Sequence, residues 1–405
     1  MMNSVALSNS MSLLEYNDLI NDYQDTLRTV VDSIRQDYPV GEFHLGGDQL
    51  AVFFYDPADA ELREKAARLR ERYPNSPKAL EIERRLERAR SRSLYGALRC
   101  GVQVKNTWIA NARNISRVES QQPVLDIGVG INLGNVILQE RADRERRIEG
   151  YAINFAKRVE GYSRYGSYCK IMLSKTAFEV FRNTIVGHTM LKQRAFFEPY
   201  VPQAGILKGL AVGTMVHELK FFHRLSGFAI QPDQVPHFTH IFTAEPTNIW
   251  AYTNLINYHL YQQDDVPTAT GLARRALYAN PHNEKIYYDL AEISFRRQEW
   301  DAAREYCQRA LRMNDQMDIA YDMLADIEEL GSGDIATELD YRSKALALSP
   351  GCAEFHFDIA MALARLKRGT EARQHLIQAR EIFPGIDKHR EKDLPELMHL
   401  LGHDA

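Results

Sequence analysis

The feature that most constrains the fold is a period of about 34 residues in the second half of the chain. Alanine recurs at this spacing, and a proline follows each alanine by five residues in all copies except one, where Asp315 takes its place. The recurring residues are Ala276, Ala310, Ala345 and Ala379, with Pro281, Pro350 and Pro384. Small residues where two helices cross, and a proline between helix pairs, suit stacked helical hairpins. We therefore expect four helix pairs over residues 246–386.

Further positions agree in the same register and identify the kind of repeat. Hydrophobic-alanine pairs recur on the first helix of successive hairpins: Leu290-Ala291, Leu324-Ala325 and Ile359-Ala360. Small residues recur seven residues before the periodic alanines in most repeats: Ala269, Ala303 and Ala372. This pattern resembles the tetratricopeptide repeat (TPR). The resemblance implies a superhelix whose concave groove binds a protein or peptide partner. Residues 223–245 are expected to be a linker, and residues 387–405 a tail that caps the stack or frays.

Composition limits the classes of partner. The 405 residues carry a formal net charge of −4, without the basic excess typical of a nucleic-acid binder. No apolar run is long enough to span a bilayer, and no basic-then-apolar leader opens the sequence. The four cysteines are far apart and form no CxxC pair or disulfide-like framework. We expect a cytoplasmic protein that binds neither nucleic acid nor membrane.

The N-terminal half begins with a helix and a hairpin. Apolar residues at helical spacing predict an amphipathic helix over residues 13–34, and residues 43–54 predict two short strands joined by a Gly46-Gly47-Asp48 turn. Glycines let the backbone of such a turn approach a ligand, so Asp48 at the tip suits a metal–phosphate site, although the tripeptide is also an ordinary turn. Residues 57–92, rich in Glu, Arg and Lys, predict a charged helical hairpin.

A second group of strands and a helix follows. Residues 124–138 predict a strand pair in which Asp126, Gly128 and Gly130 form a face small enough for close approach by a neighbour. Residues 148–160 predict a loop that leads into a helix. Asn154 and Arg158 are four residues apart on one face of that helix, where an amide and a guanidinium suit phosphate or ribose oxygens. Such a pair is also common on ordinary solvated surfaces.

Four segments, in this order, resemble the class III nucleotidyl cyclases, which include adenylate and guanylate cyclases. They are the Gly47-Asp48 hairpin, the segment from Ile127 to Val136, the run Gly150, Ile153, Asn154, Ala156 and Arg158, and Leu207 to Leu210 before Val216 to Leu219. The resemblance covers residues 3–222, with residues 57–92 as an insertion. It implies an α+β, ferredoxin-like cyclase domain over residues 1–222, followed by the α-helical TPR superhelix.

The resemblance also implies a reaction and a site. The ribose 3′ oxygen of a nucleoside triphosphate would attack the α-phosphate, giving a 3′,5′-cyclic nucleotide and pyrophosphate with the help of Mg²⁺ or Mn²⁺. Asp48 would bind metal, Arg158 would stabilise charge on the α-phosphate, and Asn154 would orient the ribose. The family assembles this site between two subunits, so a homodimer is implied. The remaining substrate-binding residues would be His44, Gly47 and Glu145.

Departures from the family pattern leave alternatives open. Ser4 matches the serine of the family's first metal motif, which places that motif's aspartate immediately before Met1. Three alternatives account for the missing aspartate: the true start lies upstream, the chain was truncated, or the protein is an impaired cyclase. His44 and Glu145 stand where the family usually has a lysine and an Asp or Cys that recognise a purine. The resemblance therefore does not decide which base the substrate carries, and a pyrimidine nucleotide is one alternative. The rival hypotheses are a catalytically impaired scaffold that binds proteins through its TPRs and, from Gly46-Gly47-Asp48, a diguanylate cyclase.

Overall fold

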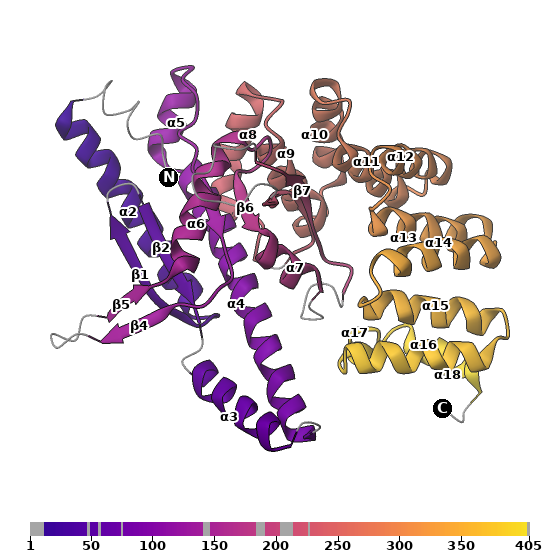
Figure 1. Ribbon diagram of the computed structural model, residues 1–405. Helices are drawn as coiled ribbons and strands as arrows, with labels where there is room; N and C mark the ends of the chain where they lie inside the picture. The colour runs from indigo at the N-terminus through magenta and orange to yellow at the C-terminus, as the bar shows by residue number, and fades with distance from the viewer. Residues whose placement is uncertain are drawn as a thin grey trace. The chain divides into compact units, whose positions relative to one another are not determined.

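A computed structural model describes residues 12–46, 49–55, 58–73, 76–140, 146–183, 191–202, 214–225 and 227–402. The chain divides into two compact units (Figure 1). The N-terminal unit comprises Met1–Thr184, Ala195–Phe222 and Ser226–Ala244. The second, which we call the repeat unit, comprises Ile185–Arg194, His223–Leu225 and Glu245–Ala405. Two short stretches, before residue 195 and after residue 222, thus belong to the repeat unit.

The N-terminal unit opens with the predicted helix and hairpin. Helix α2 (Leu13–Arg35) starts at a capping box in which Ser12 and Glu15 satisfy each other's backbone N–H groups. Strands β1 (Val40–Gly46) and β2 (Gln49–Phe54) pair in antiparallel register. The buried face of α2 packs against apolar side chains of both strands, so the predicted helix–hairpin unit is confirmed.

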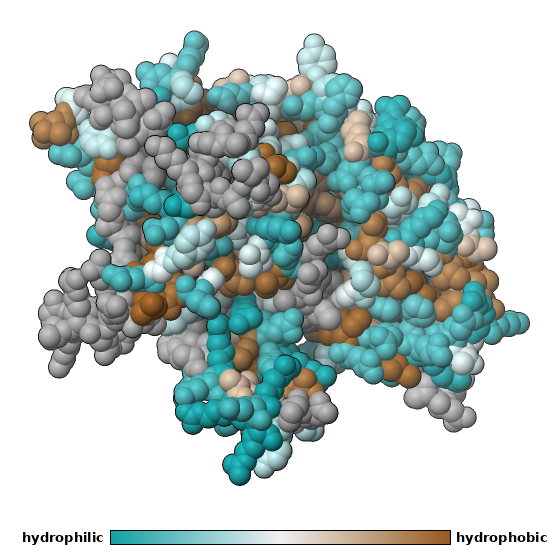
Figure 2. Space-filling view, viewed as in Figure 1, coloured by the Kyte–Doolittle hydropathy of each residue, from teal (hydrophilic) through white to brown (hydrophobic). Residues whose placement is uncertain are grey.

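The charged insertion is a helical hairpin, as predicted, but its second helix is longer. Helix α3 (Ala58–Arg72) packs against α4 (Pro77–Ile109), and this hairpin has a strongly hydrophilic surface (Figure 2). The expected end near residue 92 is wrong because the apolar periodicity continues. Cys100, Val104 and Trp108 of α4 join the core beneath α2. Helix α5 (Ala112–Glu119) follows.

The sheet topology corrects the prediction for residues 124–138. Strand β3 (Val129–Ile131) pairs in parallel with β6 (Ile171–Ser174), while β4 (Ile137–Glu140) pairs with β5 (Arg146–Glu149). The expected pairing of the two segments with each other is therefore wrong. The physical reason is burial: every residue of β6 is buried and completes the core beside β3, whereas Ile137 at the start of β4 is 62% exposed.

The largest sheet among the described residues has four strands in the order β3-β6-β8-β7, with β7 (Arg194–Tyr200) and β8 (Val216–His223) completing it. The hairpins β1-β2 and β4-β5 form separate two-stranded sheets in this part of the chain. A single ferredoxin-like sheet thus remains a prediction.

Helix α6 (Tyr151–Tyr162) lies directly on β3. A Cβ atom at Gly130 would collide with the backbone oxygen of Ala156 and the backbone nitrogen of Glu160, both on α6. The prediction that this strand face permits close approach is therefore confirmed. A short helix, η1 (Ser163–Tyr165), and then β6 and α7 (Lys175–Asn183) follow α6.

A buried carboxylate fixes the loop between η1 and β6. Glu218 on β8 is 0% exposed and accepts hydrogen bonds from the backbone N–H groups of Ser167 (2.9 Å), Tyr168 (2.9 Å) and Lys170 (2.8 Å). The hydroxyl of Tyr200 on β7 donates a fourth bond, at 2.9 Å. One side chain thereby joins two strands and a loop. The unit ends with η2 (Pro232–Gln234) and α8 (Val235–Ala244).

The repeat unit is a series of helical hairpins (Figure 1). Its helices are α9 (Ile249–Ile256), the π-helical η3 (Asn257–Gln262), α10 (Val266–Ala279), α11 (Glu284–Arg296), α12 (Trp300–Met313), α13 (Asp318–Ile327), the π-helical η4 (Glu328–Ser332), α14 (Ile335–Leu348), α15 (Ala353–Arg365), α16 (Gly369–Ile382), α17 (Ile386–His389) and α18 (Leu394–Leu401). The periodic alanines that the sequence singled out are all 0% exposed. They lie where paired helices touch, which explains why no larger residue occupies them.

The last two helices complete the core of the final hairpin. Ile386, Leu397 and Leu401 are buried in one cluster with residues of α15 and α16. Among the helices that the structure describes, none is both long and apolar enough to cross a membrane.

Candidate functional site

The predicted nucleotide clamp lies on one helix of the N-terminal unit. Asn154 and Arg158 are one turn apart on α6, where the side chain of Asn154 is exposed and that of Arg158 is half-buried. The structure therefore brings these two predicted residues together.

Of the other predicted site residues, the structure describes only the backbone of His44. His44 lies on β1 opposite Ala51, but its side chain is outside what the structure describes. Gly47, Asp48 and Glu145 lie outside the described residues altogether. Within the described ranges there is no group of three or more His, Cys, Asp or Glu side chains that could hold a metal ion. The proposed metal and base contacts therefore stay predictions.

In the repeat unit, acidic side chains of α13 and α15 gather at one place. Asp318, Asp322 and Asp326 are four residues apart along α13, and Glu354 and Asp358 are four apart on α15. Residues at this spacing share one face of a helix. We call these five residues the acidic cluster. Four of them, all except Asp326, are buried. Because isolated buried carboxylates are costly, such a cluster requires cations.

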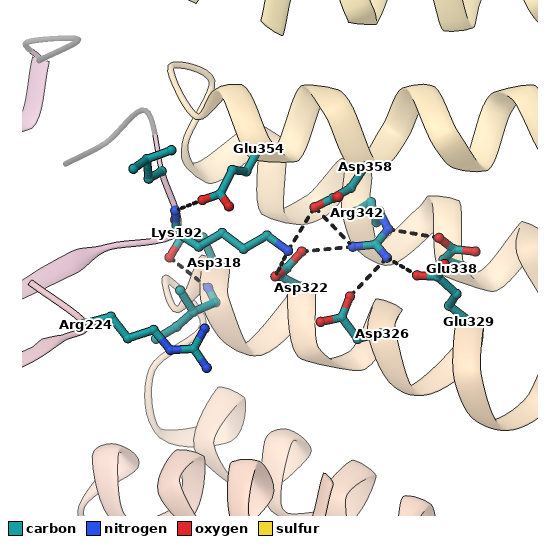
Figure 3. Close-up of polar contacts among 12 residues, drawn as sticks. Lys192, Arg224, Asp318, Asp322, Asp326, Glu329, Glu338, Arg342, Glu354 and Asp358 are labelled. Atoms are coloured by element: carbon teal, nitrogen blue, oxygen red, sulfur yellow. Dashed lines mark hydrogen bonds and ion pairs between the residues drawn. The ribbon is translucent and has the colours of Figure 1, made fainter. Parts of the chain in front are cut away.

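A short basic segment of the same unit supplies two of these cations. The Lys192 Nζ atom lies 2.6 Å from Asp322 Oδ2 and 2.9 Å from Asp358 Oδ2 (Figure 3). The Arg194 Nε atom donates to Asp318 Oδ2 at 2.6 Å. We call residues 191–194, Leu-Lys-Gln-Arg, the basic segment.

The contacts of the basic segment involve its backbone as well as its side chains. The backbone N–H of Lys192 donates to the carboxylate of Glu354. The guanidinium carbon of Arg194 and the Lys192 ammonium lie 5.3 Å and 5.9 Å from the centroid of the buried Phe355 ring. Aromatic faces attract cations at such distances. The segment is therefore held by charge, a backbone hydrogen bond and a ring.

A third cation, Arg342, enters the cluster from α14. Its guanidinium lies 3.1 Å from Asp322 and 3.0 Å from Asp326, and it also pairs with Glu329 at 2.7 Å and Glu338 at 2.9 Å (Figure 3). Unlike Lys192, Arg342 belongs to a repeat helix. Arg390, directly after α17, pairs with Asp358 at 2.6 Å, so the repeats neutralise part of the cluster themselves and the basic segment neutralises a further part.

The protonation of the cluster follows from this shared arrangement. Burial raises the pKa of Asp322, and the attraction of Lys192 opposes that rise. Burial also acts to raise the pKa of Asp358, but Lys192, Arg342 and Arg390 outweigh it and hold that pKa below its usual value. Carboxylates that share the same cations titrate as a unit. Removal of Lys192 is therefore expected to raise both pKa values.

The sequence alone did not identify this site. Lys192 and Arg194 stand in an ordinary-looking stretch at the start of β7, far in sequence from the residues that they contact. The available signal was on α13, where Asp318, Asp322 and Asp326 make an acidic stripe beside apolar residues that must be buried. Such a stripe requires cations from elsewhere in the chain or from a partner.

Comparison with known families identifies the repeats. Residues 260–327 and 340–385 match two models of the tetratricopeptide repeat. The C-terminal region contains TPR repeats. The predicted TPR pattern is thereby confirmed, whereas no cyclase domain is detected. No curated protein matches the chain.

Several solved structures are similar to part of the chain. A crystal structure of MamA is 19% identical over 38% of this chain and 90% of its own, with a TM-score of 0.34. MamA 41-end from Desulfovibrio magneticus RS-1 is 14% identical over 38% of this chain and 86% of its own, with a TM-score of 0.34. YrrB, described as a TPR protein with an unusual peptide-binding site, is 19% identical over 39% of this chain and 82% of its own, with a TM-score of 0.32.

Proposed function

We propose that the chain is a protein-binding scaffold whose TPR repeats hold a peptide segment of a partner on the acidic cluster. The observation that supports this most is that the cluster already holds a piece of polypeptide. Glu354 accepts a hydrogen bond from the backbone N–H of Lys192. Asp322 and Asp358 form ion pairs with the Lys192 side chain, and Asp318 forms one with Arg194. Contacts to both backbone and side chains are what peptide recognition requires.

Selection from a displayed library of random peptides on the full chain tests this function. The selection is repeated on Asp322→Asn/Asp358→Asn, which removes two charges with little change of shape. We expect peptides enriched on the original chain to lose binding to this variant. A matched control, Glu305→Gln/Asp340→Asn, removes two exposed carboxylates of the second helices and should keep binding. Equal enrichment on all three chains, or none on any, would reject the proposal.

We propose nucleotidyl cyclase activity of the N-terminal unit as a second function, which the TPR repeats would regulate or localise. The supporting observation is that Asn154 and Arg158 lie one turn apart on α6, and that α6 packs on the glycine face of β3. Arg158 would stabilise negative charge on the α-phosphate, and Asn154 would orient the ribose. Mg²⁺ or Mn²⁺ would neutralise phosphate charge. The carboxylate of Asp48 has the ligand chemistry for these ions, but it is not among the described residues, so we derive no step through the metal.

The cyclase proposal is tested by incubating the full chain with Mn²⁺ and each of ATP, GTP, CTP and UTP, followed by mass analysis of the products. One cyclic mononucleotide should form and should be lost in Asn154→Ala/Arg158→Ala. Lys157→Ala, an exposed neighbour on the same helix, is the matched control and should retain turnover. No product from any substrate, or full turnover in the double variant, would count against the proposal and favour the scaffold alone.

A further inference from the structure

The basic segment differs from the rest of the repeat unit in how it is attached. The hydrophobic clusters that join α13 to α18 are built from residues of the helical hairpins themselves. The basic segment contributes to none of these clusters, and its contacts with the repeats are mainly polar. Its removal would leave the apolar contacts of these clusters in place but would take two cations from the acidic cluster. Asp318 would lose its ion pair with Arg194, whereas Asp322 would keep Arg342 and Asp358 would keep Arg342 and Arg390.

Once the basic segment has left, the acidic cluster would require cations from a ligand at the positions that Lys192 and Arg194 had held. Lys192 binds between Asp322 of α13 and Asp358 of α15, while Arg194 reaches Asp318 at the start of α13. The ammonium and the guanidinium thus occupy two separate positions that are two residues apart in sequence. Uncompensated buried charge is strongly unfavourable, so a ligand without both cations would bind poorly.

We propose that the basic segment is an intramolecular ligand of the TPR repeats, and that the partner presents a Lys-x-Arg segment that displaces it. This inference rests on the proposed scaffold function and specifies its partner: a basic protein segment with lysine and arginine two positions apart. In the unliganded chain the site is occupied by residues 191–194. A partner must therefore displace those residues, so the partner and the basic segment compete for the acidic cluster.

The size of the competition follows from effective concentration. A tethered segment has an effective concentration on the order of 1 mM, so for an intrinsic Kd of about 10 μM it weakens binding of an outside peptide roughly 100-fold. Removing the tethered cations should restore the intrinsic affinity by the same factor.

The probe is a fluorescein-labelled peptide that copies residues 188–197, measured by anisotropy with the full chain. We expect Lys192→Ser/Arg194→Ser to bind it roughly 10- to 100-fold more tightly than the original chain. Arg309→Ala is the matched control: this exposed arginine pairs with Glu305 on α12 and not with the acidic cluster, and its removal should leave the affinity unchanged. A second peptide, with serine at both basic positions, should not bind. Equal affinity of variant and original chains, or equal binding of both peptides, would overturn the inference.

Hydrogen exchange on the original chain gives a measurement that does not depend on a variant folding. Excess basic peptide should accelerate exchange of the Lys192 amide, which is bonded to Glu354 in the resting chain. Unchanged exchange at saturating peptide would contradict displacement. The scaffold function and the displacement of the basic segment can be refuted separately. Library peptides that bind the chain without competing with the basic peptide would refute displacement but not the scaffold function. Absence of any cluster-dependent peptide rejects the scaffold function as well.

Discussion

Replacing Lys285 by methionine tests the energetics of a fully buried ion pair within the TPR repeats. The side chains of Lys285 and Asp289 are both 0% exposed, and Nζ lies 2.5 Å from Oδ1. The hydroxyl of Tyr252 donates to Oδ2 of the same carboxylate at 2.5 Å. Methionine has a similar length and no charge. Lys285→Met therefore removes the cation while the carboxylate and its phenol partner stay.

The expected cost follows from two opposing terms. At an effective dielectric constant of about 20, unit charges 2.5 Å apart attract by about 7 kcal/mol, and desolvation costs several kcal/mol for each ion. The intact pair therefore contributes little net stability, whereas a buried carboxylate without its cation costs about 3–5 kcal/mol. We expect Lys285→Met to destabilise the repeat unit by about 4 kcal/mol. Lys285→Met/Asp289→Leu should recover most of this loss.

The loss should depend on pH with a defined sign. Burial already raises the pKa of Asp289 in the folded chain, with Lys285 opposing the rise, so removal of the cation raises that pKa further. The folded carboxyl then holds a proton more tightly than the unfolded one, whose pKa is about 3.8. The variant should therefore lose stability as pH rises above about 4, by up to about 1.4 kcal/mol per pH unit, until the folded-state pKa is passed. The double variant should lack this slope.

Tryptophan fluorescence can report on the repeat unit alone. The chain has three tryptophans, and in a Trp108→Phe background the remaining two, Trp250 and Trp300, both lie in the repeat unit. Urea unfolding followed at these residues gives the free energy of each variant. A single variant within about 1 kcal/mol of the reference at pH 7, or a double variant as unstable as the single one, would refute the reasoning.

Three further predictions concern closely packed residues elsewhere in the chain. Glu218→Gln should destabilise the N-terminal unit by about 3 kcal/mol, because an amide cannot accept all four hydrogen bonds, and it should accelerate amide exchange in the loop before β6; unchanged exchange would contradict this role. Gly130→Ala should lower the melting temperature because its Cβ collides with Ala156 on α6, whereas Gly161→Ala, with open space around it, serves as the control. Burial, and next the charge of Arg224, lowers the pKa of His223, so the folded chain resists protonation of this histidine. The free energy of unfolding should therefore fall by up to about 1.4 kcal/mol per pH unit below pH 6.5. His223→Gln should flatten this dependence in acid unfolding curves.

The TPR repeats could be predicted from the sequence because their constraints are local and recur. A position where two helices touch excludes large side chains in every copy, so the alanines at 276, 310, 345 and 379 mark the crossings directly. The helix and hairpin in the first part of the chain were predictable for a similar reason: the apolar spacing of α2 indicates a helix, and the Gly46-Gly47 pair in the sequence indicates the end of a strand.

Strand partners and the acidic cluster depend on residues far apart in the sequence. The apolar alternation around Val129 indicates a strand but does not say that β6, some forty residues later, is its neighbour. Arg194 and Asp318 are separated by 124 residues, and nothing in the sequence around Arg194 indicates that this arginine is buried. Only the shortage of cations on α13 could have suggested a contact of this kind.

The chain connects the basic segment to the N-terminal unit without any intervening loop, and this gives the two proposals a common test. Arg194 binds the acidic cluster and is also the first residue of β7, while the N-terminal unit resumes at Ala195. Release of Arg194 by a partner would therefore free the start of a strand in the sheet that also contains β6 and β3. Coupling of this kind is worth about 1–3 kcal/mol in known systems.

If the N-terminal unit turns over a nucleotide, saturating basic peptide and the variant Lys192→Ser/Arg194→Ser should change its rate in the same direction and to the same extent. Both perturbations empty the cluster of the basic segment, so they should reach the same released state. Adding peptide to the variant should then have no further effect on the rate. Opposite changes, or additive ones, would mean that the peptide acts on turnover by a route other than release of residues 191–194.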